Sequence, residues 1–175
     1  MLPSLETILS LLDLRPHPTC GLTRETFVSA TRLPAEVLPQ GYSGPRHLGG
    51  FLYFLITPEH GVRLHRIRSE QMYHHYLGQP LDVLLLCADG SSQRHTLGPD
   101  LDVGMRPQLL IPGNAFHAAR LARPEGYALL GTSVWLRAEP DDVQMGDAAA
   151  EAPLSDGQRR ALGAFRASGA GWSRS

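Results

Sequence analysis

The sequence predicts an all-β protein, an antiparallel sandwich or barrel with one short helix at its N-terminus. Short runs rich in β-branched, aromatic and aliphatic residues follow one another closely, with little helical periodicity between them. Glycine and proline are abundant, at 18 and 14 residues, and separate these runs as turns. The length of 175 residues suits one domain with a substantial core.

The N-terminal helix is predicted over residues 3–14. Ser4 is a suitable N-cap, and apolar residues recur on one stripe at Leu5, Ile8, Leu11 and Leu12. Pro16 and Pro18 prevent the helix from continuing.

Strands are predicted from there to about residue 136. They cover residues 25–31, 49–58, 62–67, 72–77, 81–87, 94–98, 108–112, 115–121 and 127–136. The stretch "ADGSS" at 88–92 is a strong hairpin signal. A second hairpin is expected between 62–67 and 72–77, with its turn near Arg68–Glu70.

The C-terminal part differs in composition, which places a boundary after Asp147. Residues 1–147 are expected to form the folded domain, and residues 148–175 a weakly structured tail rich in Ala, Gly and Ser. "SDGQ" at 155–158 is a candidate capping box for one weak helix over Arg159–Phe165. The tail is expected to contribute little to the core.

Bulk properties exclude several classes of function. A net charge of −1 gives no sign of a nucleic-acid or membrane partner. No apolar run approaches ~20 residues, and the N-terminus lacks a basic region and a cleavage site for a signal peptide. Cys20 and Cys87 form no CxxC pair, so neither a zinc knuckle nor a disulfide framework is indicated. We therefore expect a cytoplasmic protein.

Residues 65–78, "HRIRSEQMYHHYLG", concentrate the polar groups that could carry chemistry. In a strand the side chains alternate, so Gln71, Tyr73 and His75 share one face, while Met72, His74 and Tyr76 share the other. His74 and His75 therefore cannot chelate one metal together. Arg63 and His65 are expected on one face of the preceding strand, where His65 can converge with Gln71 inside a barrel.

A second group of candidate residues follows in "GMRPQLLIPGNAFHA" at 104–118. A strand ends at Pro112, and a tight turn uses Gly113–Asn114, since Asn tolerates a positive φ. The next strand carries His117.

These two segments resemble the paired motifs of the cupin superfamily, G…HxH…E…G and G…PxG..H. The first maps onto Gly61, His65, Ile67, Gln71 and Gly78, and the second onto Gly104, Pro112, Asn114 and His117. The chain is similar to a subgroup of small single-domain cupins over about residues 8–146. Supporting stretches include "LLDLRPHP", "YFLITP", "RPQLLIP" and "YALLGTSV". The resemblance implies a double-stranded β-helix, or jelly roll, with a small-molecule site in its barrel.

Metal-binding cupins hold one divalent ion with the motif histidines and glutamate. This chain keeps His65 and His117, but it has Ile67 in place of the second histidine and Gln71 in place of the glutamate. Two histidines and a neutral amide leave a 2+ charge uncompensated. We therefore expect no cofactor; the alternative is a weakly held divalent metal with His65, Gln71, His75 and His117 as ligands.

Related cupins that epimerise deoxysugar nucleotides work without metal, using His and Tyr. By this resemblance His65 would be the catalytic base and Tyr73 or Tyr53 the acid, since an imidazole pKa near ~6.5 suits proton abstraction. Arg24 and Arg63 are the candidate ligand-binding arginines, and Arg66 and Arg106 could add positive potential for an anionic ligand.

Two main interpretations of function follow. The chain is an isomerase or epimerase of a small carbonyl-bearing metabolite, or a non-catalytic ligand-binding cupin. A metal-dependent oxygenase or decarboxylase is a third alternative, which the missing ligands weaken. We expect a homodimer, because cupin protomers commonly pair through their sheets and open sandwiches leave strand edges that need covering.

Overall fold

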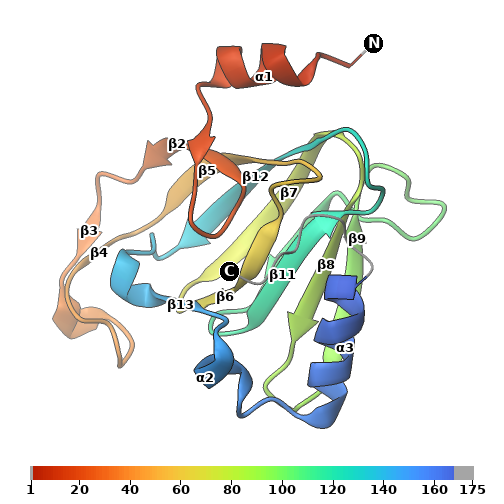
Figure 1. Ribbon diagram of the computed structural model, residues 1–175. Coiled ribbons are helices and arrows are strands. Elements are labelled where there is room, and N and C mark those ends of the chain that lie inside the picture. The colour runs from red at the N-terminus through yellow and green to blue at the C-terminus, as the bar shows by residue number, and fades with distance from the viewer. Residues whose placement is uncertain (1, 168–175) are drawn as a thin grey trace.

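Two antiparallel β-sheets face each other in the computed structural model, which describes residues 2–167 (Figure 1). The first sheet contains, in spatial order, β1 (Arg15–Pro16), β2 (Leu22–Val28), β5 (Gly50–Ile56), β12 (Ala128–Trp135), β7 (Glu70–Gly78) and β10 (Gln108–Ile111). The second contains β13 (Val143–Met145), β6 (Val62–Ile67), β11 (Phe116–Leu121), β8 (Leu81–Leu86) and β9 (Ser92–Leu97). A short ribbon of β3 (Arg32–Leu33) and β4 (Arg46–His47) lies apart.

The all-β jelly roll expected from the sequence is confirmed, and most predicted strands match observed ones within a few residues. The N-terminal helix is α1 (Leu5–Leu12), where the hydroxyl of Ser4 accepts a hydrogen bond from the backbone N–H of Thr7 at 3.1 Å. The predicted "ADGSS" hairpin joins β8 to β9, and Gly90 in its turn has φ +85°. Asn114 has the positive φ, +62°, that its turn was predicted to need.

The predicted hairpin between β6 and β7 is wrong. β6 pairs with β11 and β13 in the second sheet, whereas β7 pairs with β12 and β10 in the first. The chain crosses between the sheets at Arg68–Ser69, where the Arg68 N–H donates to the carbonyl of Asp142. A buried ion pair holds this corner, because both Asp142 carboxylate oxygens accept from the Arg46 guanidinium at 2.7 and 2.9 Å.

The main core fills the space between the two sheets. Its members come from inward positions of both, including Phe54, Ile56 and Leu130 from the first sheet and Val83 and Leu97 from the second. A smaller apolar cluster lies on the outer face of the first sheet beneath α1. The inward face of each sheet is therefore set by strand alternation, and the polar side chains on that face are enclosed with the core.

The weakly structured tail predicted for 148–175 is wrong over 148–167. This segment forms α2 (Ala148–Glu151) and α3 (Asp156–Ala167), and α3 packs beside β8 and β9 (Figure 1). Leu154, Leu162 and Phe165 are buried against the outer face of the second sheet. The average composition concealed this spacing of apolar residues along one helix face. Residues 168–175 of the predicted tail lie outside the described residues.

The predicted capping box at the start of α3 is present. The N–H of Gln158 donates to the Ser155 hydroxyl, and the N–H of Ser155 donates to the Gln158 side-chain oxygen, both at 3.1 Å. The Gln158 amide also donates to the carbonyls of Cys87 and Ser91, which ties the helix to the β8–β9 hairpin. The folded domain therefore extends beyond the predicted boundary at Asp147.

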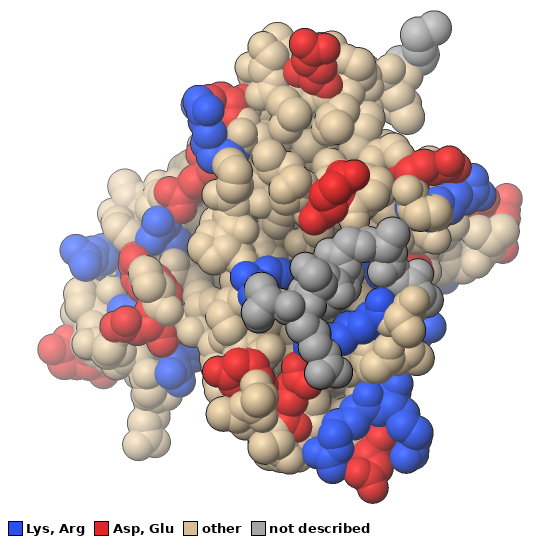
Figure 2. All heavy atoms as spheres, viewed as in Figure 1, with Lys and Arg blue, Asp and Glu red and all other residues tan. Residues whose placement is uncertain are grey.

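The molecular surface carries charges of both signs. On the face shown in Figure 2, basic and acidic side chains occur in small separate groups rather than as one continuous patch. Among the described helices, none is long and apolar enough to cross a membrane.

Candidate functional site

Four polar side chains meet between the two sheets: His65, Gln71, Tyr73 and His117, which we call the buried polar cluster. Residues 65 and 117 are paired neighbours on β6 and β11, and their ring centroids are 4.3 Å apart. Residues 71 and 73 project from β7 in the facing sheet. All four are almost fully buried, with exposed fractions between 0% and 4%. The predicted convergence of His65, Gln71 and His117 is thus observed, although their strands pair differently from the prediction.

Backbone carbonyls orient both imidazoles. Nδ1 of His65 lies 2.7 Å from the carbonyl oxygen of Arg63, and Nδ1 of His117 lies 3.2 Å from that of Ala115. A carbonyl can only accept, so each Nδ1 carries the proton and each Nε2 presents a lone pair. The Tyr73 hydroxyl donates to Nε2 of His117 at 3.0 Å, and the Gln71 amide approaches the same nitrogen at 3.3 Å.

Burial keeps the cluster uncharged at neutral pH. Desolvation lowers the pKa of His65 from 6.5 to about 4. Desolvation, together with the neighbouring His65, lowers the pKa of His117 well below 6.5. Desolvation also raises the pKa of Tyr73 well above 10. Two neutral imidazoles and a protonated phenol therefore occupy the centre of the barrel.

A chain of polar contacts leads from this cluster towards the turn between β1 and β2. The Cys20 thiol is hydrogen-bonded to Tyr73 and lies 3.1 Å from the Thr19 hydroxyl. That hydroxyl is in turn 3.1 Å from Nδ1 of His17. Burial raises the pKa of the Cys20 thiol to about 11, so it is protonated at neutral pH. Thr19 and Cys20 were not predicted as part of the site, because no sequence motif links them to His117.

Thr132 is a further inward polar residue that the sequence did not reveal. It lies on β12 directly opposite Tyr73 and is 5% exposed. Its hydroxyl is buried and has no hydrogen-bond partner among the described residues. An unpaired buried hydroxyl costs about 1–3 kcal/mol, so it marks a position where a partner from outside the chain would be stabilised.

The donor set does not fit a divalent metal ion. Within residues 2–167, no group of three or more His, Cys, Asp or Glu side chains lies close enough together to hold one. The two Nε2 lone pairs are suitable ligands, but no carboxylate offsets a 2+ charge. Nε2 of His117 is also already bonded to Tyr73.

Arg24 and Tyr53 do not reach the cluster. They are paired neighbours on β2 and β5, and Tyr53 packs in the cluster under α1, outside the barrel. Arg24 forms a 3.1 Å ion pair with Asp13 on that side. The sequence prediction was wrong here because it did not establish which face of β2 and β5 turns inward.

Arg63 and His75 also lie apart from the cluster contacts. A β-bulge in β6 places Val62 and His65 three residues apart on the inner face, so Arg63 does not share His65's face and is exposed. His75 is half-buried further along β7, where its Nε2 contacts the Gln79 carbonyl at 2.9 Å. His74 lies on the outer face as predicted, bonded to Ser133 and Gln108.

Comparisons with known proteins agree with this architecture. Solved structures similar to the chain include a protein from Shewanella oneidensis, at 24% identity and TM-score 0.77, covering 92% of this chain and 95% of the other. A hypothetical protein from Leishmania major matches at 26% identity and TM-score 0.75, covering 85% and 90%. A cupin-2 domain protein from Rhodospirillum rubrum shares the fold at 19% identity and TM-score 0.54, covering 90% and 85%.

One of the solved structures with a similar fold is an enzyme. An oxalate decarboxylase from Bacillus subtilis matches at 14% identity and TM-score 0.51, with 90% of this chain covering 35% of that one, a likeness in fold alone. No curated protein matches the sequence. Residues 6–144 match the family described as "Cupin superfamily (DUF985)". With most of its length in that match, the chain belongs to the cupin superfamily.

Proposed function

We propose that this cupin binds a small polar molecule inside its barrel, next to His65, Tyr73 and His117, without a metal ion. The neutral imidazole of His65 supplies an Nε2 lone pair and Thr132 supplies a hydroxyl in a desolvated setting, where hydrogen bonds discriminate strongly between ligands. Gln71 adds an amide that can both donate and accept. The ligand is therefore expected to carry hydroxyl or carbonyl groups rather than to be purely apolar.

Unused hydrogen-bonding capacity inside the barrel is the observation that supports this proposal. The Thr132 hydroxyl has no partner in the described chain, and none of the hydrogen bonds among the described residues involves Nε2 of His65. Buried polar groups are nearly always paired in folded proteins. A ligand that bonds to both groups would gain the free energy of two hydrogen bonds that the described chain does not make itself.

An isomerase or epimerase reaction is a second candidate. His65 is neutral, with Nε2 available as a proton acceptor, and Tyr73 is a protonated phenol that could act as acid. The low pKa makes His65 a weak base, however, because burial disfavours the imidazolium and the carbonyl bonded to Nδ1–H offsets this only in part. Ligand binding is accordingly the better-supported function.

A thermal-shift screen of chelator-treated protein against a library of small metabolites tests the binding proposal. Ligands that raise Tm in the wild type should lose the effect in His65→Gln and in Thr132→Val. The matched control His60→Gln changes an exposed histidine outside the cluster and should retain it. Equal shifts in all four proteins would place the ligand elsewhere and contradict the proposal.

Hydrogen exchange separates the second candidate from simple binding. Each hit is incubated with the protein in deuterated water, and its carbon-bound protons are followed by NMR. An epimerase would exchange the proton next to the carbonyl, and His65→Gln would abolish that exchange. Binding without exchange would support the non-catalytic alternative.

A further inference from the structure

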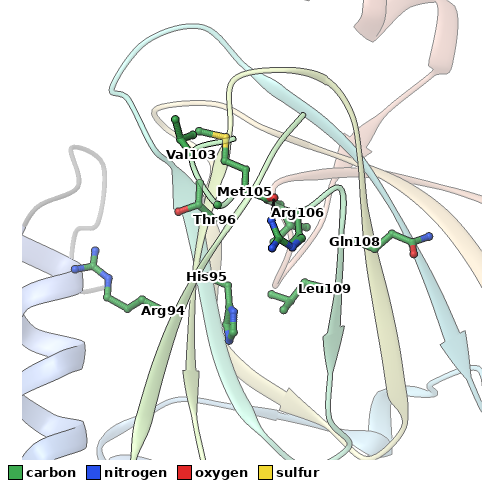
Figure 3. A pocket seen from close by; sticks show the side chains of 10 residues that line it. Arg94, His95, Thr96, Val103, Met105, Arg106, Gln108 and Leu109 are labelled. Carbon is green, nitrogen blue, oxygen red and sulfur yellow. Dashed lines mark hydrogen bonds between the residues drawn. The ribbon is translucent and has the colours of Figure 1, made fainter. Parts of the chain in front are cut away.

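A separate pocket opens at the seam between the two sheets, beside β9, β10 and the loop that joins β9 to β10 (Figure 3). Its volume is about 310 Å³, near the lower end of the range for small-molecule pockets. Leu97, Met105 and Leu109 supply apolar walls, and His95 and Arg106 supply polar groups. None of the residues that line it is acidic. From the sequence, Arg106 was expected only to add positive potential for an anionic ligand, and no pocket was predicted beside it.

The pocket leads towards the buried polar cluster. His95 lies opposite Val83 of the main core, so its side chain is on the inward face of β9. Leu109 packs against that core and is the direct neighbour of Tyr73 across β10 and β7. Figure 3 shows His95 and Leu109 facing each other across the opening, with Arg106 at its rim. The pocket wall thus includes the direct strand neighbour of Tyr73.

The backbone of Arg106 is fixed while its charge remains uncompensated. Its N–H donates to the carbonyl of Thr96, and its carbonyl accepts from Gly98, which anchors the loop on β9. One guanidinium nitrogen donates to the Met105 carbonyl at 2.7 Å. In the described part of the chain no ion pair involves Arg106. The other N–H groups of the Arg106 guanidinium are therefore free to bind an anion.

Neighbouring polar groups do not compete for this position. The guanidinium of Arg94 lies over the Phe165 ring on the outer face, 5.5 Å from its centroid, and so points away from the pocket. Gln108 also points outward and contacts His74. Nε2 of His95 contacts the side-chain oxygen of Gln93, which leaves Nδ1 as an acceptor for a ligand hydroxyl.

We infer that this pocket binds a compact organic anion, with its carboxylate or phosphate at Arg106 and its apolar part against Leu97, Met105 and Leu109. The inference rests on the proposed function in one respect. It takes the anion to be the kind of ligand that binds inside the barrel and enters it between β9 and β10. A polar group beyond the anionic end would reach His95 and then the surroundings of Tyr73.

The test uses succinate and inorganic phosphate as probes, with neutral succinamide as the uncharged analogue, in calorimetry and ¹⁵N–¹H NMR titrations of the full chain. We expect at least one anion to bind and to shift the amide signals of His95, Gly104 and Arg106. Arg106→Gln should weaken binding about tenfold or more, the usual size of a lost charge-assisted hydrogen bond. Arg106→Lys should restore part of it, and succinamide should not bind.

A matched variant provides the control. Arg32→Gln removes an exposed arginine on β3, away from the pocket, and should leave the affinities for succinate and phosphate unchanged. Binding of succinate alone identifies the carboxylate, and binding of phosphate alone identifies the phosphate. The inference is overturned if neither anion binds the wild type, or if Arg106→Gln binds as tightly as the wild type.

Failure of this inference can be told apart from failure of the proposed function. If metabolite binding depends on His65 and not on Arg106, the barrel site stands and the anion pocket falls. If anion binding depends on Arg106 while no metabolite depends on His65, the pocket stands and the barrel proposal falls.

Discussion

The imidazoles of His65 and His117 lie side by side on two neighbouring strands, with 4.3 Å between their ring centroids and their planes tilted by 53°. Each donates its Nδ1–H to a backbone carbonyl two residues earlier in the chain, so both present Nε2 as a lone pair. Two imidazolium ions so close together in a desolvated interior would repel each other strongly. Both imidazoles are therefore expected to remain neutral in the folded protein.

Gln71→Glu should create a divalent-metal site. The introduced carboxylate would add a third ligand next to the two Nε2 atoms and would offset the metal charge. We expect the affinity for Zn²⁺ or Mn²⁺ to rise by about tenfold or more, most clearly above neutral pH, where the buried carboxylate ionises. Calorimetry on chelator-treated protein measures this.

The control for that experiment is Gln144→Glu, which places the same change on the exposed strand β13. It should not alter metal affinity. If Gln71→Glu bound metal no better than Gln144→Glu, the two histidines and residue 71 could not converge on one ion in solution.

Stability should fall as the pH falls from about 6.5 to about 4. The folded-state pKa of His65 is about 4, below its ordinary value of 6.5, so the unfolded chain binds more protons in this window. The contribution is fully present above pH 6.5 and is lost as the pH falls through the folded pKa. It amounts to about 3 kcal/mol for His65 alone, and His117 shifts in the same direction.

Urea unfolding at pH 7 and at pH 4.5 measures this dependence. His65→Gln should reduce the difference between the two pH values, whereas His60→Gln should leave it unchanged. A difference that is the same in wild type and His65→Gln would show that the imidazole is not held neutral by burial.

Removing the main packing contact of the C-terminal helix α3 should destabilise the domain. Phe165 is fully buried, and the guanidinium groups of Arg120 and Arg94 lie over its ring at 4.6 and 5.5 Å from the centroid. Phe165→Ala should cost about 3–5 kcal/mol of unfolding free energy. The exposed Arg160→Ala on the same helix should cost little. If Phe165→Ala were as stable as Arg160→Ala, the helix would not be docked in solution.

The chain should form a homodimer through the outer face of the first sheet. Apolar and aromatic side chains are exposed on that face at Phe27, Phe51, Tyr76, Leu110 and Trp135. Such a patch on a sheet is unfavourable in water and marks an interaction surface. Light scattering at micromolar concentration should give twice the monomer mass for wild type and a monomer mass for Phe51→Asp. A monomeric wild type would contradict the prediction.

Much of the fold could be predicted from the sequence because its signals are local. Strand alternation, the Gly90 turn, the positive φ of Asn114 and the Ser4 cap each depend on a few adjacent residues. The resemblance of the paired motifs then brought His65, Gln71 and His117 together, and the structure places them in one cluster.

The remaining site residues depend on long-range geometry that adjacent residues do not encode. Arg24 and Tyr53 were assigned to the wrong side of the first sheet, since alternation gives two faces and not which one is inward. The bulge in β6 turns the Arg63 side chain outward, whereas regular alternation would have placed it on the same face as His65. Thr132 became a candidate only when β12 was in place, and the pocket beside Arg106 became visible only when β9 and β10 were in place.

The central claim is that the barrel centre is a neutral hydrogen-bonding site and not a metal centre. Elemental analysis of untagged protein tests it most directly, both as purified and after incubation with Zn²⁺, Mn²⁺ and Fe²⁺ followed by desalting. We expect far less than one metal ion per chain in every sample, because the cluster offers two neutral imidazoles and no carboxylate. A metal content near one per chain that is lost in His117→Gln would contradict it.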